Sequence, residues 1–273
     1  METSRGGEAA PIIRRARGFR LYDSQGRRFL DLYREGGGAL LGHRSAVTVM
    51  KSVLSQGLVS GIPSVWEARL VRAVASLIPG HRRVVLYSSR QRALEAISNA
   101  IGMRVDPSDL LDPALSEMPS VRPRACLWRP FIAGERRFED CPAVLAVLPL
   151  TVCEAPSPVC FSDFPGELPP SEPLPGFLLA GAFSALVRLG KCGRFAEDPL
   201  VVKALDGSAG WARKGPYVRA TFSADEYPRV FGEFLRAGVL LSPAYPGPSI
   251  LPGECSPGEA RLLAGLFARI PGG

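Results

Sequence analysis

One stretch decides the fold of this chain: VVLYSSRQRALEAISNAI, residues 84–101. It opens with a continuous apolar run that ends in Ser88 and Ser89, which is typical of a buried strand. From Gln91 onward it carries apolar residues at helical spacing. The stretch therefore predicts a strand, a tight turn and a helix, the unit from which α/β domains are built. Backbone N–H groups at the start of such a helix form an anion-binding site.

The residues before this stretch predict a hairpin and a pair of helices. Residues 12–33 contain two short apolar segments separated by the turn-forming sequence DSQG, which indicates a small β-hairpin. Residues 45–57 and 64–78 carry apolar residues at helical spacing, and the second segment is followed by a Pro-Gly pair that ends a helix.

The residues after it continue the α/β pattern. Residues 102–124 are rich in proline and glycine and read as a loop. Apolar runs at 144–150 and 159–161 predict further buried strands. The stretch LPPSEPLPG, residues 168–176, is typical of a linker, and FLLAGAFSALVRL, residues 177–189, predicts a strong helix.

The last part of the chain has a different organisation. From Tyr217 onward a strand, a helix, a strand and a helix alternate, which suits a small α+β lobe. We therefore expect an N-terminal hairpin segment at 1–44, a reduced large α/β domain at 45–210 and a small C-terminal α+β domain at 211–273.

Composition excludes several classes of protein. The chain has 273 residues, 46% of them hydrophobic and 22% charged, which is typical of a globular protein. The N-terminus has no apolar signal region, and no run approaches the roughly 18 apolar residues that cross a bilayer. We therefore expect a cytoplasmic protein without a membrane partner. The net charge is +7, but the arginines are dispersed, which indicates general surface charge and no nucleic-acid partner.

The cysteines give no metal or disulfide pattern. No C-x-x-C pair occurs, and His43 and His81 are the only histidines, so a structural zinc site has little support. We interpret the cysteines as reduced, mostly buried thiols; they are Cys126, Cys141, Cys153, Cys160, Cys192 and Cys255.

Both ends of the chain carry family motifs. The N-terminal part has Gly18, the triplet Leu21-Tyr22-Asp23, Gly26, the triplet Phe29-Leu30-Asp31 and then Leu41-Gly42-His43. The C-terminal part has YPRVFGEFLRAGVLLSP, residues 227–243. These motifs resemble class III aminotransferases, and within them the glutamate-1-semialdehyde aminomutase-like branch. The resemblance implies a fold-type-I α/β protein with a reduced, mostly parallel-sheet large domain and a small C-terminal α+β lobe. It also implies pyridoxal phosphate (PLP) as cofactor and a homodimer.

The resemblance places a phosphate cradle at Ser89, Arg90 and Gln91. Family members have a glycine where Arg90 stands, and a left-handed conformation there would disfavour arginine by about 1 to 2 kcal/mol. Arg90 and Arg92 either bind an anion or are solvated at an exposed helix start. For the carboxylate that holds the pyridine nitrogen, the best match is Asp163, although a surface-turn aspartate is the alternative reading.

The Schiff-base lysine is the point on which activity depends. The chain has only Lys51, Lys191, Lys203 and Lys214. One alignment with the family makes Lys203 the Schiff-base residue. The other places the helix at 177–189 after the family's lysine position, which leaves no lysine between Ser89 and Gly190. Chain order favours the second alignment, and Lys203 is then a surface residue at the end of a strand.

The remaining family positions carry no chemistry of their own. Gly36, Gly37, Gly38 and His43 fall where the resemblance places the substrate entrance and dimer interface, and a structural role for His43 is favoured. Our first hypothesis is a degenerate, PLP-free scaffold for assembly or for binding an amino acid, a keto acid or another anionic small molecule. The second is an active PLP-dependent aminotransferase or aminomutase that uses Lys203. A third is a non-catalytic partner of a full-length relative.

Overall fold

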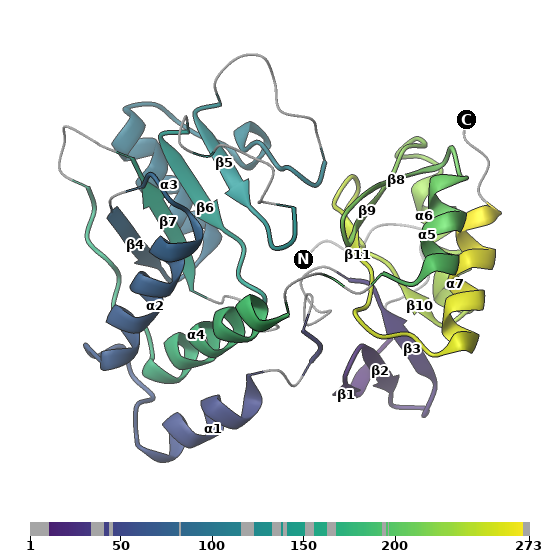
Figure 1. Ribbon diagram of the computed structural model, residues 1–273, viewed down its shortest axis with the longest axis horizontal. Coiled ribbons are helices and arrows are strands. Elements are labelled where there is room, and N and C mark those ends of the chain that lie inside the picture. The colour runs from purple at the N-terminus through teal and green to yellow at the C-terminus, as the bar shows by residue number, and fades with distance from the viewer. Residues whose placement is uncertain are drawn as a thin grey trace. The chain divides into compact units, whose positions relative to one another are not determined.

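The computed structural model describes residues 11–33, 41–43, 46–81, 83–115, 123–132, 138, 141–150, 156–162, 168–192, 195 and 197–269. The chain forms two compact units (Figure 1). The first combines the two ends of the chain, Met1–Arg44 and Arg194–Gly273, and the second is the continuous middle, Ser45–Gly193. We call them the terminal unit and the central unit.

The central unit is an α/β layer structure. Its sheet has the strand order β4–β7–β6–β5. β5 and β6 run parallel, whereas β7 is antiparallel to both β4 and β6. β4, β5 and β6 therefore run in the same direction and β7 alone runs in the opposite one, so the expectation of a mostly parallel sheet is confirmed for the described strands. The elements are α1 (Val47–Ser55), α2 (Val65–Leu77), β4 (Arg83–Tyr87), α3 (Arg90–Ile101), the short 3₁₀ helix η1 (Pro107–Asp109), β5 (Ala125–Trp128), β6 (Ala143–Ala146), β7 (Ser157–Phe161) and α4 (Gly176–Lys191).

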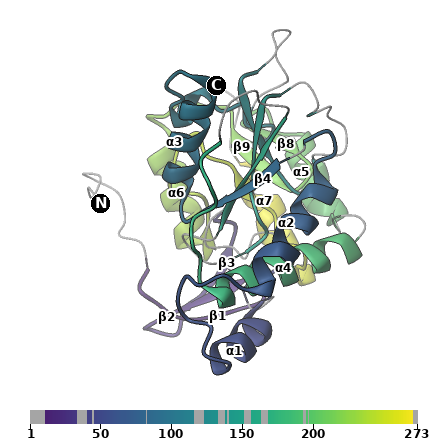
Figure 2. The same ribbon diagram turned by 90° about the vertical axis from the view of Figure 1, so that its left-hand side faces the viewer.

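Helices cover both faces of this sheet. α3 lies on one face, and α2, with α4 packed against it, lies on the other (Figures 1 and 2). The apolar face of α3, which includes Ala93 and Ile97, packs on Val85, Leu127 and Phe161 of the strands. This packing gives the predicted strand, turn and helix their fixed position, and it confirms that unit of the sequence analysis.

Residues 168–176, which read as linker-like in the sequence, make specific contacts. They belong to the central unit and run along the edge of β4 that does not pair with β7. The backbone N–H of Leu86 donates to Oγ of Ser171 at 3.1 Å, and the backbone N–H of Glu172 donates to the carbonyl of Leu86 at 2.9 Å. The segment therefore covers an edge strand whose backbone groups would otherwise need other partners.

The terminal unit joins the N-terminal hairpin to the C-terminal lobe. One sheet has the order β1–β2–β3–β10 and the other the order β11–β9–β8. β3 pairs in parallel with β10, with Leu30 opposite Val239 and Asp31 opposite Leu240. The elements are β1 (Ile13–Arg17), β2 (Arg20–Asp23), β3 (Arg28–Asp31), α5 (Pro199–Asp206), β8 (Trp211–Lys214), β9 (Tyr217–Ala220), α6 (Tyr227–Arg236), β10 (Val239–Leu240), β11 (Ser249–Ile250) and α7 (Pro257–Ala268).

The units divide the chain differently from the expected domains. The sequence analysis gave the hairpin segment at 1–44 and the C-terminal lobe as separate parts of the chain, whereas Leu30 and Leu32 share one core with Val239, Trp211 and Phe267. We also placed the second boundary at residue 210, whereas the terminal unit begins again at Arg194. The reason is α5, which packs on α7 and β8. Within the described ranges, no helix is both long and apolar enough to cross a membrane.

Candidate functional site

The turn between β4 and α3 is built by two serines. β4 ends at Tyr87, and Ser89 has an extended backbone with φ −151° and ψ 163°. Its Oγ accepts the backbone N–H of Arg92 at 3.2 Å, so Ser89 is the N-cap of α3. The structure thus gives Ser89 a helix-capping role at the position where the resemblance placed the phosphate cradle.

Arg90 and Gln91 begin the helix. Arg90 is the first residue of α3, so its backbone is helical. It therefore avoids the left-handed conformation that would disfavour an arginine at a position where the resembled family has glycine. The side-chain amide of Gln91 donates to Oε1 of Glu95 at 3.3 Å. Gln91 is therefore turned along its own helix.

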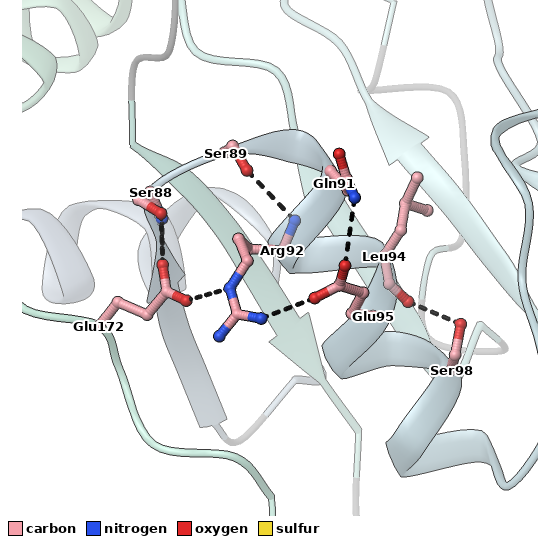
Figure 3. A network of polar contacts seen from close by, with 8 residues as sticks. All are labelled: Ser88, Ser89, Gln91, Arg92, Leu94, Glu95, Ser98 and Glu172. Carbon is pink, nitrogen blue, oxygen red and sulfur yellow. Dashed lines mark hydrogen bonds and ion pairs between the residues drawn. The ribbon is translucent and has the colours of Figure 1, made fainter.

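Glu172 completes this turn from a distant part of the chain. Its carboxylate contacts both Ser88 and Arg92, and Arg92 bridges it to Glu95 (Figure 3). Nε of Arg92 lies 2.6 Å from Oε1 of Glu172, and its Nη1 lies 2.7 Å from Oε2 of Glu95. The sequence analysis missed Glu172, because its stretch read as a linker.

These contacts shift the ionisation of both charged partners. Burial by itself raises the pKa of the Glu172 carboxyl, but hydrogen bonds from Ser88 and from Arg92 outweigh it, and the pKa falls below its ordinary value. The side-chain hydrogen bonds to Glu172 and then to Glu95 raise the pKa of Arg92. Glu172 and Arg92 therefore stabilise each other's charged form within the turn.

The residue after β5 is a buried cation. Arg129 is 1% exposed, and its Nε donates to Oδ1 of Asp112 at 2.6 Å. Its Nη2 also donates to Oδ2 of the same carboxylate. The resemblance implies a carboxylate beyond a buried strand, free to face the pyridine nitrogen of PLP. The residue that follows β5 is instead Arg129, and the carboxylate of Asp112 is hydrogen-bonded to the Arg129 guanidinium. Asp163, the predicted pyridine partner, lies outside the described residues.

No lysine lies in the strands or turns of the central unit. Between residues 52 and 190 the sequence has none. Lys51 is exposed on α1, and Lys191 is exposed at the end of α4. Lys203 is exposed on α5 of the terminal unit, so its surface position is confirmed, but it lies in a helix and not at the end of a strand.

His43 has a structural environment in the terminal unit. Its Nε2 lies 2.7 Å from Oδ2 of Asp31, and its backbone N–H donates to the carbonyl of Gly18 at 2.7 Å. Asp31 also accepts the backbone N–H of Tyr33. This pair ties the Leu-Gly-His motif to β3, as the structural reading of His43 predicts. Residues 36–38 lie outside the described ranges.

A groove of about 1050 Å³ runs along α3 and begins beside this turn. Arg90 and Gln91 line one end, and Asp106 and Pro107 line the other. Apolar side chains of Leu94, Met103 and Val105 lie between them. The groove is a concave surface for a small molecule, separate from the donors that Glu172 occupies.

The described residues do not fit PLP. At the start of α3 the donors of Ser88 and Arg92 are taken by Glu172, which carries the same sign of charge as a phosphate. The central unit offers only exposed lysines on its helices. Among the described residues, no group of His, Cys, Asp and Glu has a metal-binding arrangement either.

Comparisons with sequences give relatives without an assigned role. No family model matches the chain. An uncharacterized protein from Treponema pallidum is 28% identical over 283 residues, 88% of each chain. An uncharacterized protein from Borreliella burgdorferi is 35% identical over 94 residues, 34% of this chain and 35% of that protein. A glutamate-1-semialdehyde 2,1-aminomutase from Ruminiclostridium cellulolyticum is 32% identical over 92 residues, but the match spans only 33% of this chain and 20% of that enzyme.

Comparisons with solved structures cover nearly the whole chain. An omega-transaminase from Sphaerobacter thermophilus matches with a TM-score of 0.70 at 14% identity, over 98% of this chain and 92% of that chain. An ornithine aminotransferase from Plasmodium yoelii matches with a TM-score of 0.64 at 12% identity, over 97% and 95%. These likenesses, together with the α/β architecture of the central unit, give the chain the fold of the fold-type-I aminotransferases.

Proposed function

We propose that this chain is a degenerate aminotransferase-like protein that lacks the Schiff-base lysine and acts as a binding or assembly scaffold. The observation that carries the proposal is the distribution of lysines. The unit that holds the α/β sheet has only Lys51 and Lys191, and both are exposed on helices. PLP chemistry begins from a lysine amine that forms an imine with the cofactor, so a sheet without such an amine cannot start it.

The alternative function is an active PLP enzyme that uses Lys203. An imine-forming lysine needs surroundings that favour the neutral amine, usually by removing it from water. Lys203 lies on the exposed side of α5, whose buried residues are Val201 and Leu205. This position leaves the amine in contact with water, which supports the degenerate protein over the active enzyme.

The proposed partners follow from the resemblance and from the groove. We propose a homodimer, because the resembled family builds its sites across two subunits. The proposed ligand is an amino acid, a keto acid or another anionic small molecule. Its proposed place is the groove along α3, where Arg90 lies at the rim beside the apolar residue Leu94.

The decisive measurement is the visible absorbance of the purified protein titrated with PLP, before and after borohydride. We expect no stable aldimine band, and only scattered labelling of surface amines after reduction and peptide mapping. Lys203→Ala should behave as the wild type does, and Lys191→Ala serves as a matched control on another exposed helical lysine. A band that is trapped at Lys203 and abolished by Lys203→Ala would overturn the proposal in favour of the enzyme.

The assembly part has its own test. Light scattering coupled to size exclusion should give a particle of twice the 29.3 kDa of one chain. A monomer over the whole concentration range would contradict the homodimer and direct the search to a full-length aminotransferase as partner.

A further inference from the structure

The carboxylate of Glu172 lies where the donors of the turn between β4 and α3 converge (Figure 3). Its Oε2 accepts the backbone N–H of Ser88 at 2.8 Å and the Ser88 hydroxyl at 2.5 Å. Its Oε1 accepts Nε–H of Arg92 at 2.6 Å. A backbone N–H, a hydroxyl and a guanidinium at the start of a helix are the donors with which proteins bind phosphate and carboxylate groups. Here the acceptor is part of the chain itself.

The backbone of Glu172 holds the carboxylate in this position. Its N–H donates to the carbonyl of Leu86 at 2.9 Å, while Leu86 donates its own N–H to the side chain of Ser171. The hydroxyl of Tyr87 donates to the carbonyl of Pro169 at 3.3 Å. Prolines before and after Glu172 restrict the backbone further. The carboxylate therefore belongs to a segment whose backbone is hydrogen-bonded along β4.

The carboxylate and the donors of the turn stabilise each other. The side chain of Glu172 is 19% exposed, and the partial burial of its carboxylate is compensated by the donors that it accepts from. Conversely, without the carboxylate the N–H of Ser88 and the guanidinium of Arg92 would meet at the positive end of the α3 dipole. Each side of this contact therefore stabilises the other, and an external anion at this place would meet the same donors.

We propose that Glu172 is a built-in substitute for a bound anion, which closes the turn between β4 and α3 to the phosphate group of any ligand. The inference extends the proposed function, because it explains how this turn stays assembled in a chain that has no use for a cofactor. Glu172 is in this sense a positioning residue for α3.

Inorganic phosphate is the probe that tests this role. In the wild type we expect phosphate to leave both the Tm and the amide resonance of Ser88 unchanged relative to chloride at equal ionic strength. In Glu172→Ala we expect a lower Tm, which phosphate raises again, together with a phosphate-dependent shift of the Ser88 amide. Glu172→Gln keeps the size of the side chain and loses its charge, so it should show the same response if Glu172→Ala does not fold.

Glu95→Ala is the matched control. It removes the other carboxylate on Arg92 but leaves the contact between Glu172 and Ser88, so we expect no phosphate response. A phosphate-dependent Ser88 shift in the wild type would overturn the inference, and so would Glu172 variants that are neither destabilised nor rescued by phosphate. None of these readouts involves a lysine. An aldimine at Lys203 would therefore refute the proposed function separately from this inference.

Discussion

Arg20 and Glu259 bind each other through two parallel hydrogen bonds although 239 positions separate them in the chain. Nε of Arg20 donates to Oε1 at 2.8 Å, and Nη2 donates to Oε2 at 2.6 Å. The pair joins β2 of the N-terminal hairpin to the first turn of α7, and the Glu259 side chain is 5% exposed. It is a bidentate, mostly buried contact that fastens the two ends of the chain into the terminal unit.

Glu259→Gln should destabilise the terminal unit by about 2 kcal/mol, because a hydrogen-bonded charge pair loses one charge while the other stays partly buried. Glu259 also closes a capping box with Ser256, but glutamine serves equally at that position of a capping box. The loss therefore reports the contact with Arg20 together with the longer ion pair to Arg28, whose Nη2 lies 3.8 Å from Oε1 of Glu259. Urea unfolding measures it, with Glu254→Gln on the exposed residue nearby as control. Equal stability of the two variants would contradict the prediction.

The same carboxylate predicts an acid dependence. The side-chain hydrogen bond from Arg20 lowers the pKa of Glu259 to about 2, although burial acts to raise it. A carboxyl with a lowered pKa stabilises the fold above its ordinary value, near 4.5, and this stabilisation is lost as the pH falls toward 2. The difference in unfolding free energy between the wild type and Glu259→Gln should thus be full at pH 7 and shrink between pH 4.5 and pH 2. A difference that stays constant over this window would refute the assignment.

Local elements could be predicted from the sequence because each follows from a local pattern. The apolar run before Ser88 and the helical spacing after Gln91 become β4 and α3. The apolar segment at 177–189 becomes α4, and the alternation after Tyr217 becomes β9, α6, β10 and α7. Periodicity reports which side of an element is buried, and that information lies within a few turns of chain.

Contacts between distant segments could not be predicted in this way. Glu172 lies 84 positions from Ser88, and no spacing rule connects a glutamate among prolines with a serine after a strand. The antiparallel direction of β7 depends on its neighbours β4 and β6, whereas its apolar residues fit either direction. The position of α5 depends on its packing against α7, and the position of Lys203 follows from that of α5.

Gly42→Ala should destabilise the terminal unit by about 1 to 2 kcal/mol or more. Gly42 has φ +75°, a left-handed conformation, and a Cβ atom there would lie 3.0 Å from the carbonyl oxygen of Gly18. That carbonyl also accepts the N–H of His43, so it cannot move away freely. Thermal unfolding measures the loss.

Gly265→Ala is the control for that substitution. Gly265 lies in α7, and a Cβ atom there meets nothing within 4 Å. Alanine should therefore stabilise the helix, by up to about 1 kcal/mol. If both alanine variants shifted the Tm in the same direction, the assigned backbone conformation of Gly42 would be wrong.

Thiol labelling should separate the described cysteines by burial. Cys192 is exposed, Cys126, Cys141 and Cys160 are buried, and Cys255 is partly exposed. Burial raises the pKa of both Cys160 and Cys255 to about 12, so that little thiolate is present even where reagent has access. At pH 8 we expect rapid labelling of Cys192, slow labelling of Cys255 and labelling of the buried thiols only after unfolding, followed by peptide mapping. Cys192→Ser should remove the rapid labelling of the peptide that contains residue 192. If Cys255 reacted as fast as Cys192, the assigned burial of the Cys255 thiol near Glu259 would be wrong.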